Sequence, residues 1–189
     1  MKSEAVKAAA PGAEAVLNRE RVGALRVLGI DTSLRGTGIG VVEWRDGRMQ
    51  GIAYDVLVNP AARPLSGCLV HIQRSLTVIL AEMQPDVAAI EGVFFARYAQ
   101  TAMILGHARG VAIAACAAAA LPVFEYAPRR VKQAVAGYGA ATKEQMQAMV
   151  TKQLGLDKQP PEDAADALAI AICHIHNHLR VALADVKQL

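Results

Sequence analysis

The chain has 189 residues, of which 53% are hydrophobic and 20% charged, and its formal net charge is +3. This composition excludes a disordered or collagen-like chain and predicts one compact domain with a sizeable core. Aromatic residues make up only 4% of the chain, which argues against a protein that stacks successive single-stranded bases on aromatic side chains.

The first half of the ordered chain has the pattern of a strand meander followed by a helix. Short connections, one of them the turn signal Asp46-Gly47, predict that the first three strands are antiparallel. Apolar residues at three- and four-residue spacing then predict an amphipathic helix. We expect strands at 26–31, 36–45 and 49–58 and the helix at 65–83.

Strands and helices alternate in the second half. We expect strands at 86–91 and 122–126 and helices at 99–121, 142–154 and about 162–183. A meander followed by this alternation predicts an α/β fold, a five-stranded mixed sheet with three antiparallel strands and then parallel strands, flanked by helices. We expect a poorly ordered leader at 1–24, one domain at 25–184 and a short tail at 185–189.

Four acidic residues stand out by position. Asp31 ends the first expected strand and Glu91 ends the fourth. If these strands are parallel neighbours, both carboxylates meet at the edge of the sheet where ligands bind in α/β proteins. Asp163 and Asp166 are three residues apart in the first turns of the last helix and therefore share a face.

Asp166 is the least ordinary of these acids, because it lies in the nearly all-apolar segment 164–170. Such a helix is buried, and burying an unpaired carboxylate is costly or forces its protonation. A bound cation would remove that cost. Oxygen ligands without cysteine favour Mg²⁺ or Mn²⁺, and two such ions support phosphodiester hydrolysis. The alternative is four separate solvated acids, with Asp163 favoured by the helix dipole.

Six segments go beyond pattern: Leu28–Asp31, Ala89–Glu91 with Val93-Phe94, Leu105–Ala112, Pro122–Ala127, Val131–Gln133 and Asp163–Ala171. In this order and at these spacings they resemble the RuvC family of bacterial Holliday junction resolvases. The resemblance runs from about residue 25 to residue 178. It implies the RNase H-like fold, which agrees with the element order above.

The resemblance also implies an activity. The family makes paired, metal-dependent nicks across four-way DNA junctions in recombination and repair. Asp31, Glu91, Asp163 and Asp166 match its four catalytic carboxylates, which bind the metal. Two Mg²⁺ ions are implied in the active complex, with Mn²⁺ able to substitute. The implied partners are junction DNA, a second copy of the chain in a homodimer, and a branch-migration motor.

Residues outside the acidic cluster are implied to contact DNA. Phe94 matches an aromatic residue that contacts bases at the junction. Lys132 and Lys143 match basic residues near the scissile phosphate. Arg129 and Arg130 extend Lys132 into a basic stretch that can hold phosphates.

One departure from the family leaves two alternatives open. The first acidic motif usually continues Asp-Pro-Gly, whereas Thr32-Ser33 follows Asp31 here. The first alternative is a junction-binding protein with weakened catalysis. The second is a nucleotide-binding domain of the actin-like ATPase and sugar-kinase class, whose phosphate turn the segment Gly29–Gly38 resembles. That class needs two such domains, and this chain has room for one.

The cysteines and the hydrophobic pattern bear on the compartment. Cys68, Cys116 and Cys173 are odd in number and widely spaced, which indicates reduced core residues in a cytosolic protein. No segment reaches the roughly 18 apolar residues of a membrane span. We therefore expect a cytoplasmic protein that does not bind membranes.

Overall fold

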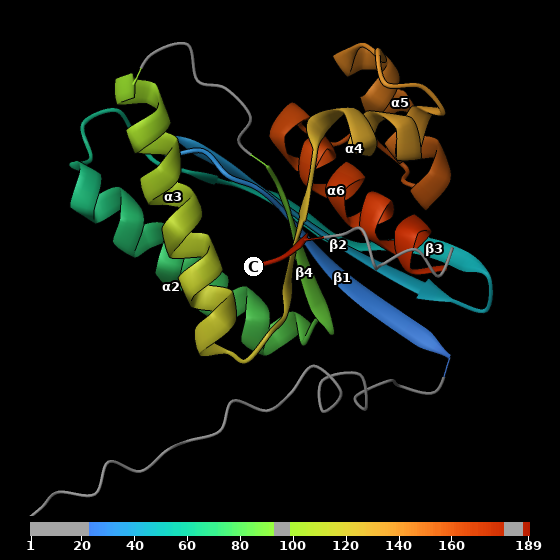
Figure 1. The fold of residues 1–189 in the computed structure, drawn as a ribbon, viewed down its shortest axis with the longest axis horizontal. Coiled ribbons are helices and arrows are strands. Elements are labelled where there is room, and N and C mark those ends of the chain that lie inside the picture. The colour runs from blue at the N-terminus through green and yellow to red at the C-terminus, as the bar shows by residue number, and fades with distance from the viewer. Residues whose placement is uncertain (1–22, 93–98, 180–186) are drawn as a thin grey trace, which may run out of the picture.

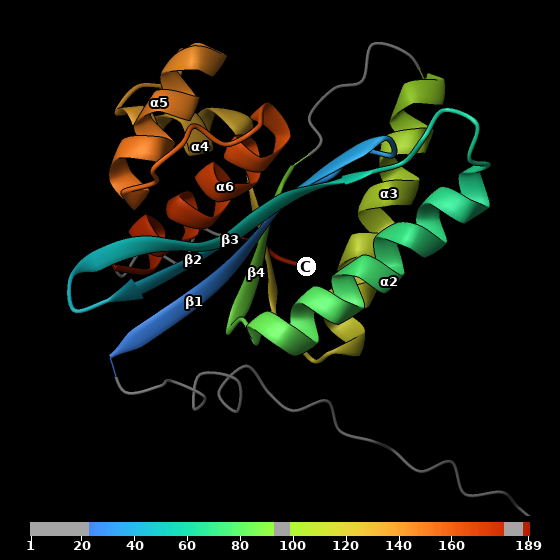
Figure 2. The ribbon, with the colours of Figure 1, turned by 180° about the vertical axis from the view of Figure 1, so that it is seen from behind.

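The structure is a computed structural model that describes residues 23–92, 99–179 and 187–189. A mixed sheet lies between two layers of helices (Figure 1). The view from behind shows the same layers with the long strands β2 and β3 in front (Figure 2). This arrangement confirms the expected α/β architecture. The expected leader lies almost entirely outside the described residues.

The sheet has the order β3-β2-β1-β4-β5-β6. β1, β2 and β3 form the expected antiparallel meander, and β4 and β5 lie parallel to β1. A short β6 pairs with β5 in the antiparallel sense and adds a sixth strand to the five expected. The strands are β1 (Ala24–Asp31), β2 (Gly36–Arg45), β3 (Arg48–Val58), β4 (Val87–Glu91), β5 (Val123–Tyr126) and β6 (Lys187–Gln188).

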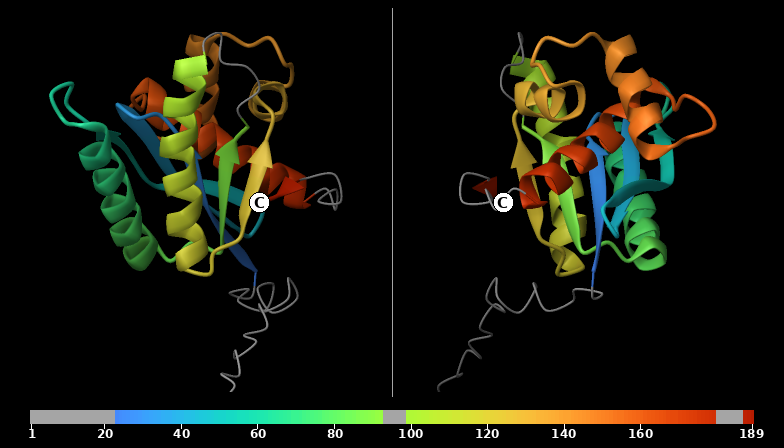
Figure 3. Two further views of the ribbon diagram at one scale, coloured as in Figure 1. Left: turned by 60° about the vertical axis from the view of Figure 1, so that its left-hand side comes forward. Right: turned by 90° about the vertical axis from the view of Figure 1, so that its right-hand side faces the viewer.

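Helices α2 and α3 cover one face of the sheet, and α4, α5 and α6 cover the other (Figures 1 and 3). The helices are α2 (Leu65–Met83), α3 (Ala99–Ala118), α4 (Pro128–Ala136), α5 (Lys143–Leu154) and α6 (Glu162–Leu179). The sequence did not predict α4, because its nine residues offer only Val131 and Val135 as buried positions. α5 begins after a capping box at Thr142, as its sequence predicts.

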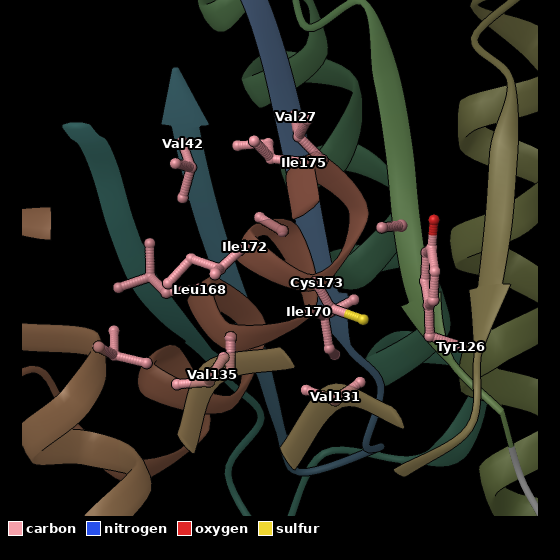
Figure 4. Close-up of a cluster of buried hydrophobic side chains, with 14 of the residues drawn as sticks. Val27, Val42, Tyr126, Val131, Val135, Leu168, Ile170, Ile172, Cys173 and Ile175 are labelled. Atoms are coloured by element: carbon pink, nitrogen blue, oxygen red, sulfur yellow. The ribbon is translucent and has the colours of Figure 1, made fainter. Parts of the chain in front are cut away.

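Two hydrophobic cores hold these layers together. Alternate residues of β1 serve each of them, because side chains of a strand point to opposite faces. Leu28 packs toward α2 and α3, whereas Val27 packs toward α6. Figure 4 shows Leu168, Ile172 and Ile175 of α6 in the core on the α6 side of the sheet, together with side chains of the strands. α6 is therefore the helix most deeply embedded against the sheet.

Glycines let the backbone of α6 rest directly on the sheet. Gly36, Gly38 and Gly40 alternate along β2 and so face the same side. A Cβ atom at Gly38 would lie 1.9 Å from the carbonyl oxygen of Asp163, and one at Gly40 would lie 2.7 Å from the nitrogen of Leu168. Only a residue without a side chain fits at these positions. The start of α6 is thereby held against the start of β2.

Helix α3 departs from one expectation. Within residues 23–92, 99–179 and 187–189 it is the one helix long and apolar enough to cross a membrane, with a mean hydropathy of 1.4. This helix does not contain an unbroken apolar run, because His107 and Arg109 interrupt it and alanines and glycines, which are only weakly apolar, fill half of its length. Core helices pass the same test, so this is weak evidence for a membrane. One side of α3 packs on the sheet through Ala108, Ala112 and Cys116.

The three cysteines are all buried and free, as predicted. Burial raises the pKa of Cys116 and of Cys173 to about 12. Both thiols therefore stay protonated at neutral pH and act as small apolar core residues.

Candidate active site

The ends of two parallel strands bring Asp31 and Glu91 to the same edge of the sheet. β1 and β4 are hydrogen-bonded neighbours, and their last registered pair is Ile30 with Ile90. Asp31 and Glu91 are the next residues, one on each strand. Both side chains therefore leave the sheet at its carboxyl edge, where the sequence placed them.

The first turns of α6 lie over this edge. Asp31 is paired with Gly38 across β1 and β2, and the main chain of Asp163 lies directly on Gly38. A Cβ atom at Gly36 would lie 2.7 Å from Oδ2 of Asp163, so that carboxylate lies beside the start of β2. The spacing of glycines two residues apart on one strand is the sequence signal for this approach.

The carboxylates act on one another electrostatically. The pKa of Asp31 is raised from 3.8 to about 7 by burial first, and then by the negative charges of Asp166, Glu91 and Asp163. Burial and Asp166 raise the pKa of Glu91. Burial, followed by Asp163, also raises the pKa of Asp166. Asp31 thus lies within electrostatic reach of the other three acids, and Asp166 of both Glu91 and Asp163, as four separate solvated acids would not.

This donor set fits a hard divalent cation. Carboxylate oxygens are the ligands that Mg²⁺ and Mn²⁺ prefer, and a cation among these acids would offset their mutual repulsion. Within the part of the chain that the structure describes, no group of three or more His, Cys, Asp or Glu side chains is already arranged to hold a metal ion. Coordination would therefore be completed by rotation of the carboxylates, by water or by phosphate oxygens, as is common for Mg²⁺.

Two lysines face the acidic cluster from the α4–α5 side. Lys143 lowers the pKa of Asp31 and of Asp166, and Lys132 lowers the pKa of Glu91 and of Asp166. Lys143 also forms an exposed ion pair with Glu162 at the start of α6. Exposed ion pairs contribute little to stability, so the Lys143 ammonium can exchange Glu162 for a phosphate.

The two arginines of the basic stretch differ in their surroundings. Arg129 is exposed at the start of α4. Arg130 instead donates to the Asn177 side chain through Nε at 3.1 Å, and its guanidinium lies 5.9 Å from the centre of the Tyr126 ring. The structure therefore uses Arg130 to join α4 to β5 and α6. Phe94 lies outside the described residues.

The turn after Asp31 is held by hydroxyl groups. Ser33 Oγ accepts hydrogen bonds from the backbone N–H of Arg35 at 3.3 Å and of Gly36 at 3.2 Å. The hydroxyl of the buried Thr37 donates to the carbonyl oxygen of Ser33 at 2.5 Å. The Ser33 side chain thus supplies local bonds that order the turn. The departure at Thr32-Ser33 therefore still gives a turn held by side-chain hydrogen bonds.

The chain matches a family model described as "Crossover junction endodeoxyribonuclease RuvC" over residues 27–174. Two relatives carry that same description. The protein from Syntrophomonas wolfei is 46% identical over 155 residues, which are 82% of this chain and 90% of that protein. The protein from Chloroflexus aggregans is 49% identical over 153 residues, 80% of this chain and 93% of that protein.

Solved structures agree with these relatives. RuvC of Thermus thermophilus in complex with a Holliday junction substrate aligns with a TM-score of 0.79 and 33% identity, covering 87% of this chain and 99% of that one. The yeast mitochondrial Holliday junction resolvase Ydc2 aligns with a TM-score of 0.59 at 12% identity. This second likeness concerns the fold alone, and it extends the fold match beyond close relatives.

Proposed function

Because this chain belongs to the RuvC family of crossover junction endodeoxyribonucleases, we propose that Asp31, Glu91, Asp163 and Asp166 are its catalytic and metal-binding residues. The protein is an endonuclease that resolves four-way (Holliday) DNA junctions, and its family depends on divalent metal. The parallel register of β1 and β4, which brings Asp31 and Glu91 together under α6, carries the assignment of the site.

The proposed cofactor is Mg²⁺, with two ions in the active complex and Mn²⁺ as a substitute. When bound, such ions polarise the scissile phosphate and assist ionisation of the attacking water. The four carboxylates hold and orient these ions. Hydrolysis then joins the water oxygen to phosphorus and breaks one ester bond, and the leaving oxygen takes up a proton.

Basic residues around the acidic cluster are proposed to hold the DNA backbone. Lys132 and Lys143 are placed for this role, because both already lower pKa values within the cluster. Arg129 is exposed beside them, whereas Arg130 acts mainly through its bond to Asn177. Phe94 is proposed to contact bases at the junction, as the family resemblance implies.

A homodimer is proposed, since paired nicks on two opposing strands need two active sites. The outer side of α3 supports it. Exposed small or apolar residues follow this helix at three- or four-residue spacing, namely Ala99, Met103, Gly106, Gly110 and Ala114. Met103→Glu should shift sedimentation toward the monomer. Val78→Glu, at an exposed position on α2, is the matched control.

Three further assignments follow the resemblance. We propose a branch-migration motor as a partner and the cytoplasm as the compartment, which the free buried cysteines favour. We also propose one nuclease domain over residues 25–184, with β6 added to its sheet by residues 187–188. Co-purification of the motor with wild-type protein and with variants of its exposed surfaces would test the first of these.

A nicking assay on four-way and linear DNA, side by side, tests the proposal. With Mg²⁺ or Mn²⁺ the protein should cut the four-way junction and leave the linear duplex intact. Asp31→Asn, Glu91→Gln and Asp166→Asn should abolish cutting while junction binding persists. Full cutting by any of these variants would remove that residue from the site. A wild-type protein that binds junctions without cutting them would establish the weakened-catalysis alternative, and saturable ATP binding would support the nucleotide-binding one.

A further inference from the structure

The structure contains a largely buried cation beside the proposed active site, and the sequence analysis gave this residue no role. The side chain of Arg109, on α3, is only 12% exposed. One of its nitrogens donates to the backbone carbonyl oxygen of Glu91, and the other pairs with the carboxylate of Glu125 on β5. A single guanidinium thus joins a helix to the ends of two adjacent strands.

Glu91 stands where the strand ladder supports the main chain from one side. It lies one residue past the last registered β1–β4 pair, Ile30 with Ile90. On the other side β5 holds it through the pair Glu91 with Tyr126, and the next amide, of Gly92, donates to the Tyr126 carbonyl at 2.8 Å. The guanidinium supplies an anchor for the Glu91 main chain from the α3 layer, so it limits how far the backbone at Glu91 can shift.

We propose that Arg109 is a positioning residue that fixes the Glu91 main chain and so aims the Glu91 carboxylate at the metal-binding cluster. This inference rests on the proposed role of Glu91 as a metal ligand. Partners that orient a ligand from outside the coordination shell typically change metal affinity by about 10- to 100-fold when removed. The alternative is an ion pair that only stabilises the packing of α3, and it predicts no change in metal affinity.

The chain offers a matched control for this alternative. Arg26 on β1 has an 18% exposed side chain and makes the same kind of contacts. It donates to the Glu43 carboxylate at 2.7 Å and to the Met83 carbonyl at 2.5 Å. It lies five residues before Asp31, about 16 Å along the strand and therefore away from the site. Removing either arginine should cost comparable stability, but only the removal of Arg109 should weaken metal binding.

The experiment compares Arg109→Met, Arg109→Lys, Arg26→Met and Glu91→Gln in the full chain. We would measure Mn²⁺ binding to the free protein by calorimetry, junction binding without divalent metal, melting temperature, and the Mg²⁺ concentration that half-saturates cleavage. For Arg109→Met we expect about tenfold weaker Mn²⁺ binding and a matching rise in half-saturating Mg²⁺, with junction binding within twofold of wild type. Arg109→Lys keeps the charge with fewer donors and should recover part of the loss.

The outcomes separate the two levels of the proposal. Unchanged Mn²⁺ affinity in Arg109→Met, with Glu91→Gln inactive, overturns the positioning role alone. Equal loss of affinity in Arg26→Met overturns it as well, since the effect would then follow stability. Wild-type Mn²⁺ affinity and cutting in Glu91→Gln overturn both the metal role of Glu91 and the inference. If Arg109→Met fails to fold, Glu125→Ala removes the carboxylate that holds the guanidinium, and unchanged Mn²⁺ affinity there and in Arg109→Lys overturns the positioning role.

Discussion

Replacing Asp31 with Asn should abolish cleavage and at the same time stabilise the metal-free protein. Burial and the charges of Asp166, Glu91 and Asp163 raise the pKa of Asp31 from 3.8 to about 7. At about 1.4 kcal/mol for each pKa unit, the ionised carboxylate costs roughly 4 kcal/mol above pH 7. Partial contact with solvent reduces this figure, so we expect a gain of about 2 to 4 kcal/mol from the neutral amide.

The sign of the pH dependence follows from a pKa that is raised on folding. The Asp31 carboxyl is neutral in both states below 3.8, so it costs nothing there. The cost grows as pH rises from 3.8 to about 7 and is constant above that. The advantage of Asp31→Asn over wild type should therefore be small at pH 4 and largest at pH 8.

Thermal unfolding in EDTA at several pH values measures this directly. A chain of this size shifts its melting temperature by roughly 2 to 4 °C for each kcal/mol, so Asp31→Asn should melt about 4 to 16 °C above wild type at pH 8. Asp157→Asn, at an exposed position, is the control. Added Mg²⁺ should raise the melting temperature of wild type more than that of Asp31→Asn. Equal melting temperatures in EDTA at pH 8 would refute the reasoning.

Three further substitutions test other parts of the site. Gly38→Ala would bring a methyl group within 1.9 Å of the Asp163 carbonyl oxygen, so it should cost about 1 to 3 kcal/mol or more and abolish cutting; wild-type activity and melting temperature would contradict the close approach of α6. Ser33→Ala removes the acceptor of two backbone N–H groups and should cost about 1 kcal/mol and slow cleavage; an unchanged cleavage rate would show that the turn needs no hydroxyl. Lys143→Ala should reduce the salt dependence of junction binding by about one ion. It should also move the acid limb of the pH–rate profile to higher pH, because Lys143 lowers the pKa of Asp31, and an unmoved limb would separate this lysine from the cluster.

Much of the fold was accessible from the chain because its signals are local. Asp31 and Glu91 each follow an apolar run, so their place at strand ends could be predicted without knowing how the strands pair. The limits of α5 follow from Thr142 and Gly155, which cap the helix through contacts with residues close by in sequence. Signals of this kind survive in the sequence because each depends on a few adjacent residues.

The features that were not predicted depend on contacts between distant residues. Arg130 bonds to Asn177, 47 residues away, and nothing in the basic stretch distinguishes it from Arg129. The two-residue strand β6 forms because residues 187 and 188 pair with β5, and not because their own sequence favours a strand. Arg109 lies in a helix of mostly small residues, where its link to Glu91 is visible only after the helix is packed.

The row of glycines on β2 has a consequence for which substitutions such an enzyme can accept during evolution. The main-chain separation between β2 and the start of α6 is set by direct contact at Gly38 and Gly40, so no side chain at these two positions enters it. Hydrophobic residues elsewhere in the core can then be exchanged for others of similar volume, and the main-chain distance between β2 and α6 at the proposed active site stays constant. Tolerance to drift in the interior and strict preservation of the chemistry can therefore coexist in one small protein.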